Sequence, residues 1–138
     1  MKISSAIATI ILGVFFLSGC ASKKQTSGSQ SLTSQKWTLL SAGDVDAGSS
    51  GAFIQFGTAP GEVRGKAGCN GFGGNYTSEG NNLKLGGLMG TKMACPALDV
   101  ENAFFRALEV TERYEIRKDS LFLYQGDKLL ATLKASDK

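Results

Sequence analysis

Glycine punctuates this chain more densely than an ordinary globular sequence. It accounts for 18 of the 138 residues, about 13% against a usual value of about 7%. Most of these glycines lie between residues 43 and 90, where they separate short apolar runs. Such runs are too short for regular helices, and glycine favours tight turns, so the spacing predicts many short β-strands.

Five strands are expected before residue 94: 36–40, 52–56, 62–67, 71–78 and 81–93. Trp37 and Leu39 fall on one face of the first strand, and Leu83 and Leu85 alternate around a lysine in the fifth. In the third strand, Gly65 leaves room for a bend or a bulge.

One helix is expected, at residues 96–111. Pro96 is compatible with a first helical turn, and Asp99 and Glu101 favour a helix N-terminus. Residues at helical spacing form one apolar stripe, which we interpret as a core face: Val100, Phe104, Ala107, Leu108 and Thr111.

The last third of the chain has the pattern of a three-stranded meander, at 113–117, 120–124 and 128–133. Strands, one helix and more strands predict an α+β domain that is mainly antiparallel β. We expect a small, partly closed β-barrel-like domain with one helix packed against it.

The N-terminus has the features of an export signal. A positive charge at Lys2 precedes an apolar run over 6–17, which has the length of a signal-peptide core and is short for a membrane span. The sequence Leu17-Ser18-Gly19-Cys20 resembles the lipobox of bacterial lipoproteins. That resemblance implies a signal peptide at 1–19 and acylation, including palmitate, at Cys20; an ordinary secretory peptide or a short buried helix is the alternative. The following Ala21 favours the outer membrane, facing the periplasm.

Residues 20–35 are polar, with Leu32 their one large apolar residue, and are expected to form a flexible tether ahead of a single domain at 36–138. Without Lys2 the chain has 14 basic residues (15 − 1) against 12 acidic ones. No basic cluster stands out along the sequence, so we expect no nucleic-acid partner.

The chain has no histidine, which excludes Ser-His and Cys-His catalysis within the chain and most zinc chemistry. Cys69 and Cys95 remain once Cys20 is acylated. In an oxidising compartment they are expected to form a disulfide; two reduced, buried cysteines or a reactive thiol at Cys95 are the alternatives. No metal site or cofactor is expected.

The segment "GKAGCNGFGGNY" at 65–76 does not have the glycine spacing of a phosphate-binding loop. Its glycines suit positive φ angles or close strand approach. Asn70 is expected to hydrogen-bond the backbone of the turn, with a ligand contact as the alternative. Arg64 and Lys92 are interpreted as solvated charges. We therefore interpret the segment as a structural corner.

Taken together, "VRGKAGCNGFGGNY" (63–76), "GTKMACP" (90–96) and the Glu101-Asn102-x-Phe104 pattern resemble the META domain, also called HslJ-like. The resemblance covers about residues 36–134. It implies a small β-barrel-like domain with a helix, found on many bacterial lipoproteins and associated with stress tolerance. It supplies no catalytic residue.

The sequence therefore predicts a non-enzymatic, membrane-anchored envelope protein that binds an envelope protein or a lipid, in stress tolerance or assembly. A lipid tail would need an apolar slot between the helix stripe and Leu83, Leu121 and Leu123. The alternatives are a thiol-dependent redox enzyme using Cys69 and Cys95, and a periplasmic protease inhibitor presenting the loop at 41–51.

Overall fold

The computed structural model of the chain describes residues 31–33, 35–58 and 61–136. The expected signal peptide and the acylation site Cys20 lie outside the described residues. The elements in chain order are β1 (Lys36–Ala42), β2 (Val45–Asp46), β3 (Phe53–Phe56), β4 (Glu62–Lys66), β5 (Gly71–Glu79), β6 (Asn82–Gly90), α1 (Leu98–Glu109), β7 (Arg113–Arg117), β8 (Ser120–Gln125) and β9 (Lys128–Ser136).

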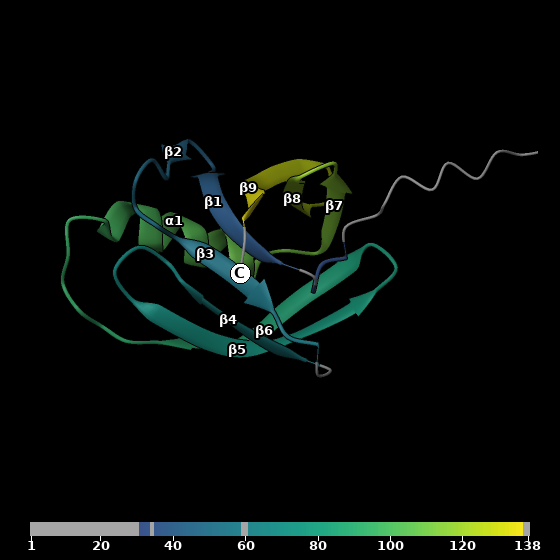
Figure 1. Ribbon diagram of the computed structural model, residues 1–138, viewed down its shortest axis with the longest axis horizontal. Helices are drawn as coiled ribbons and strands as arrows, with labels where there is room; N and C mark the ends of the chain where they lie inside the picture. The colour runs from purple at the N-terminus through teal and green to yellow at the C-terminus, as the bar shows by residue number, and fades with distance from the viewer. Residues whose placement is uncertain (1–30, 34, 59–60, 137–138) are drawn as a thin grey trace, which may run out of the picture.

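The strands form one antiparallel sheet in the order β2-β1-β3-β4-β5-β6-β7-β8-β9, and an additional β1–β9 pairing closes it into a ring (Figure 1). The pairing around the ring is shortest between β6 and β7, which are joined by the single residue pair Asn82↔Arg113. Helix α1 contacts β6, β1, β2 and β9. The predicted fold, a partly closed antiparallel barrel with one helix, is confirmed.

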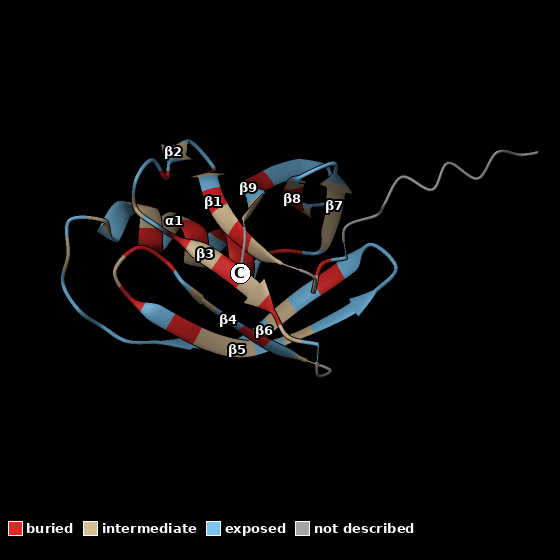
Figure 2. Ribbon diagram, viewed as in Figure 1, coloured by how far each residue is buried: buried red, intermediate tan, exposed pale blue. Residues whose placement is uncertain are grey.

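The core fills the space between the inner sheet face and α1. Phe104 and Leu108 of α1 have no exposed surface, and neither do Leu83, Leu121 and Leu123 of the strands. All five belong to one cluster of buried side chains, and Figure 2 shows buried positions recurring along the strands and α1. The space between the helix stripe and Leu83, Leu121 and Leu123, where a lipid tail would need a slot, is therefore occupied by packed side chains.

The packed part of the chain begins before residue 36. Leu32 is only 5% exposed and belongs to the core. Its carbonyl oxygen accepts a hydrogen bond of 2.9 Å from the indole N–H of Trp37, which is itself completely buried. A single apolar residue in a polar segment thus packs in the core because a buried tryptophan offers it both a surface and a donor.

Two local expectations differ from the structure. Strand β4 has no bulge at Gly65. The nearest register shift along the chain lies between β5 and β6, between Gly73 and Asn75, where Gly87 has a φ of 59°. The loop at 41–51 contains the short strand β2, and Ala47 in it is buried. The segment is therefore a compact hairpin, because its backbone bonds back onto β1 through Ala47 N–H and the Leu40 carbonyl, 2.9 Å apart.

Candidate functional site

The segment joining β6 to α1 carries the motif "GTKMACP" (90–96) over the surface. Thr91, Lys92, Met93 and Ala94 are all exposed and lie outside any helix or strand. The Met93 side chain is 58% exposed, and Met89 at the end of β6 is 79% exposed. Figure 1 shows this segment, in green, at one end of the long axis, far from residues 31–33. We refer to residues 91–94 as the presented loop.

The buried side chain of Asn70 forms hydrogen bonds to the presented loop. Its side chain is 1% exposed, and its carbonyl oxygen accepts hydrogen bonds of 2.8 Å from the Met93 backbone N–H and from the Thr91 hydroxyl. Its amide nitrogen donates to the Met93 carbonyl oxygen at 3.0 Å. One buried side chain thus occupies both backbone hydrogen-bonding groups of an exposed residue.

Glu101 completes the buried end of this arrangement. The residue is 8% exposed. Its carboxylate accepts a hydrogen bond of 2.9 Å from the Asn70 side-chain amide and one of 3.2 Å from the Asn70 backbone N–H. Glu101 lies three residues before Phe104 and seven before Leu108, so α1 turns it toward the core with them. The sequence predicted Glu101 only as part of the helix N-terminus; its spacing of three and seven residues from Phe104 and Leu108 is the signal that could have shown its inward orientation.

The predicted disulfide is present. Cys69 and Cys95 are bonded, with their Cα atoms 6.2 Å apart, and both residues are partly buried. The alternative of two separate reduced cysteines is therefore wrong. Because Cys69 precedes Asn70 and Cys95 follows the presented loop, the covalent bond and the Asn70 hydrogen bonds join the same two segments.

Two glycines of the motif are required by close packing. A Cβ on Gly65 would lie 2.6 Å from Cζ of Phe72 and would also meet the carbonyl oxygen of Phe53. At Gly68, φ is 129° and a Cβ would lie 3.1 Å from the carbonyl oxygen of Ala97, just before α1. The interpretation as a structural corner therefore has a specific cause, which is the approach of this turn to the start of the helix.

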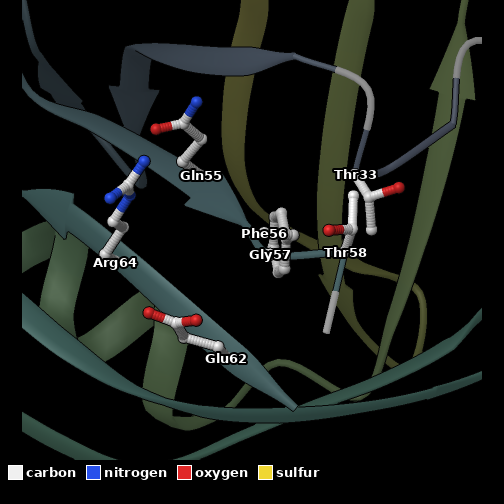
Figure 3. Close-up of a pocket in the computed structure, with 7 residues that line it drawn as sticks. All are labelled: Thr33, Gln55, Phe56, Gly57, Thr58, Glu62 and Arg64. Carbon is white, nitrogen blue, oxygen red and sulfur yellow. The ribbon is translucent and has the colours of Figure 1, made fainter. Parts of the chain in front are cut away.

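A second, polar feature lies at the entry of the folded chain. A hollow of 280 Å³ is lined by residues of the entering segment, β3, β4 and the loop between them: Thr33, Gln55, Phe56, Gly57, Thr58, Glu62 and Arg64 (Figure 3). Beside it, the Tyr76 hydroxyl donates to the Gly57 carbonyl oxygen at 3.0 Å. Burial, with a smaller electrostatic effect of Tyr114, raises the pKa of Tyr76.

Within residues 31–33, 35–58 and 61–136, no three His, Cys, Asp or Glu side chains are grouped so as to hold a metal ion. The helix in this part of the chain is not long and apolar enough to cross a membrane. The ion pairs found among the described residues all belong to the β7–β9 meander, away from the disulfide. Arg64 and Lys92 are exposed.

The model of one known family, the META domain, matches residues 30–137. The chain belongs to the META domain family. The match begins two residues before Leu32, so the family boundary includes the packed segment that composition alone assigned to the tether. The sequence resemblance to this family is confirmed, and the META domain forms all of the structure described above.

Solved structures share the fold of this META domain at low sequence identity. A protein solved by NMR is 22% identical, with a TM-score of 0.61, covering 77% of this chain and 92% of its own. A second NMR structure, from Burkholderia xenovorans, is 22% identical with a TM-score of 0.62, covering 78% and 85%. The crystal structure of a DUF4847 family protein from Bacteroides vulgatus is 14% identical with a TM-score of 0.60, covering 78% and 96%. No curated protein matches the chain significantly.

Proposed function

We propose that this META domain protein is lipid-anchored at Cys20 in the bacterial cell envelope and binds another envelope protein through the presented loop, without a catalytic step. The observation that carries the proposal is the pair of hydrogen bonds between the Asn70 side chain and the Met93 backbone. Because both its N–H and its C=O are hydrogen-bonded within the domain, the backbone of Met93 is ordered in the absence of a partner. Pre-ordering of this kind lowers the entropic cost of binding.

The chemistry of the exposed residues suits a protein partner. Met93 and Met89 offer unbranched, polarizable side chains, which adapt to an apolar recess on another protein. A protein partner is favoured over a lipid tail because the core between α1 and Leu83, Leu121 and Leu123 is filled by side chains. The placement of the loop far from residues 31–33 supports the proposal, since a tether from Cys20 would enter at the other end.

The thiol-enzyme and protease-inhibitor alternatives gain no comparable support. Cys69 and Cys95 already share a disulfide next to a network of satisfied hydrogen bonds. The loop at 41–51 is folded onto β1. Outer-membrane placement and a role in stress tolerance or assembly remain part of the proposal.

Two experiments test the two halves separately. Labelled palmitate should be incorporated by the full chain in a Gram-negative host and not by Cys20→Ser. A photo-crosslinking residue at position 93 of the anchored protein should capture one defined envelope protein. The same residue at position 40, where Leu40 is 45% exposed on β1, should not. Equal capture at both positions, or none at position 93, would contradict the proposed binding loop.

A further inference from the structure

The strand register gathers cations that are far apart in the sequence. One cross-strand row on the outer face runs Ser136–Lys36–Gln55–Arg64 across β9, β1, β3 and β4. The neighbouring row, two residues along each strand, runs Lys134–Thr38–Phe53–Lys66 across the same strands. Directly paired residues of antiparallel strands share one face of the sheet. We call these eight residues the basic face.

The burial pattern places the basic face outside the barrel. Trp37, Ile54, Val63 and Leu133, which alternate with its residues, are all buried in the core, whereas Arg64, Lys66 and Lys134 are exposed. With strands about 4.8 Å apart and about 3.3 Å per residue, the two rows cover about 15 Å by 7 Å.

The basic face carries four cations and no carboxylate among its eight residues. The acids next to it are Asp119, which lies 3.5 Å from the Lys134 ammonium group, and Glu62, one row further along β4. Within this face the Thr38 and Ser136 hydroxyls are hydrogen-bonded to each other at 2.9 Å. The Lys36 ammonium group lies 5.4 Å from the centre of the Phe53 ring. The surface therefore suits a broad anionic partner.

The entry of the chain indicates which anionic partner this is. Thr33 lines the same hollow as Gln55 and Arg64 of the basic face (Figure 3). Cys20 precedes Thr33 by thirteen residues (33 − 20), which can span at most about 45 Å. The rim of the basic face is thus the point at which a chain anchored at Cys20 enters the domain.

We propose that the basic face rests on the anionic phospholipid surface of the membrane that carries the anchor. This inference rests on the proposed lipid anchor for its geometry, while the charge arrangement stands independently of it. Each Lys or Arg close to an anionic leaflet adds to membrane attraction, and this attraction falls off within a Debye length. Contact through this face would orient the domain as well as tether it.

The test uses the chain from residue 21 to residue 138, which contains every residue placed in the core and lacks Cys20. Its sedimentation is measured with vesicles of phosphatidylcholine alone and of equal parts phosphatidylcholine and phosphatidylglycerol. We expect binding to the anionic vesicles at about 0.02 M salt and its loss at about 0.5 M salt. We expect no binding to the neutral vesicles.

A matched pair of variants distinguishes the effect of the basic face from the effect of the net charge of the domain. Replacing Lys36, Arg64, Lys66 and Lys134 with Gln should lower partitioning about tenfold or more. Replacing the exposed residues Lys84, Lys92, Arg106 and Lys128 with Gln removes the same charge elsewhere and should lower it much less. Circular dichroism confirms that both variants fold.

Lysine acetylation supplies an independent measurement. On anionic vesicles, Lys36, Lys66 and Lys134 should be protected, while Lys84 and Lys128 react as in solution. Absence of binding to anionic vesicles, or equal losses in the two variants, would overturn the proposal. Because no acyl chain is present, these outcomes are independent of palmitate labelling at Cys20.

Discussion

The side chain of Asn70 binds both backbone polar groups of Met93, accepting from its N–H at 2.8 Å and donating to its carbonyl oxygen at 3.0 Å. A buried side chain thereby takes the place of a neighbouring strand for a residue that lies on the surface. The same side chain also donates to Glu101, so the presented loop and α1 depend on one amide group.

Replacing Asn70 with Ala should destabilise the domain by about 3 kcal/mol or more, because it deprives a buried carboxylate and three groups of the loop of their side-chain partner. The free energy of unfolding is measured with urea. Asn75→Ala, at an exposed position of β5, is the control and should change stability by about 0.5 kcal/mol at most. Similar values for the two variants would show that the Asn70 network does not stabilise the fold.

Replacing Gly65 with Ala should cost about 1 to 3 kcal/mol, because the new methyl group would overlap the Phe72 ring and the Phe53 carbonyl oxygen. Gly86→Ala is the matched control, since nothing lies within 4 Å of a Cβ there. That control should be neutral or stabilising by about 0.5 kcal/mol, through the lower entropy of the unfolded chain. Guanidinium unfolding midpoints compare the two, and equal midpoints would contradict the close approach at Gly65.

Replacing Leu32 with Ala in the chain 21–138 should cost about 2 to 3 kcal/mol, because the side chain fills part of the core. Leu40→Ala removes the same atoms from a position that is 45% exposed and should cost about 0.5 kcal/mol. Urea unfolding measures both. A Leu32 variant as stable as the Leu40 variant would mean that the domain does begin at residue 36.

The stability contribution of Glu115 should depend on pH. Hydrogen bonds from Arg113, and then from Arg117, hold the pKa of Glu115 below its ordinary value of 4.5. A lowered folded-state pKa gives stabilisation that is present at neutral pH and lost as the pH falls through that lowered value. Glu115→Gln should therefore be less stable than the wild type at neutral pH and low salt, with the difference disappearing well below pH 4.5.

The control for this pH effect is a double-mutant cycle. In a chain that carries Arg113→Gln and Arg117→Gln, the further change Glu115→Gln should no longer produce a pH-dependent difference in unfolding free energy. If the difference persists there, the lowered pKa of Glu115 arises from something other than these two guanidinium groups. High salt should also reduce it, because the pairs are near the surface.

Much of the fold was predictable because its signals are local. Alternation placed Trp37 and Leu39 inward, and the helical stripe placed Phe104 and Leu108 in the core. The predicted strands and helix agree with the structure to within a few residues. The disulfide was also predicted, from the small number of cysteines and the expected export to an oxidising compartment, and the structure contains it.

The rest of the site could not be read along the chain. The Asn70 side chain was expected to bond the backbone of its own turn, yet its partners lie at residues 91, 93 and 101. The tight packing at Gly65 depends on the ring of Phe72 across the β4–β5 pairing. Charge along the sequence showed no cluster, because Lys36, Arg64, Lys66 and Lys134 become neighbours only through the pairing of four strands.

The sequence by itself therefore determined the class of the fold, the strands and helix and the inward faces, and it predicted the pairing of Cys69 with Cys95. These depend on the periodicity of apolar residues, on glycine spacing and on which reactive groups are present, all of which a linear chain displays. The tertiary structure decided which residue holds the presented loop, where the packed domain begins and where the cations gather. Those outcomes depend on strand register and on contacts between distant segments, which arise only when the barrel closes.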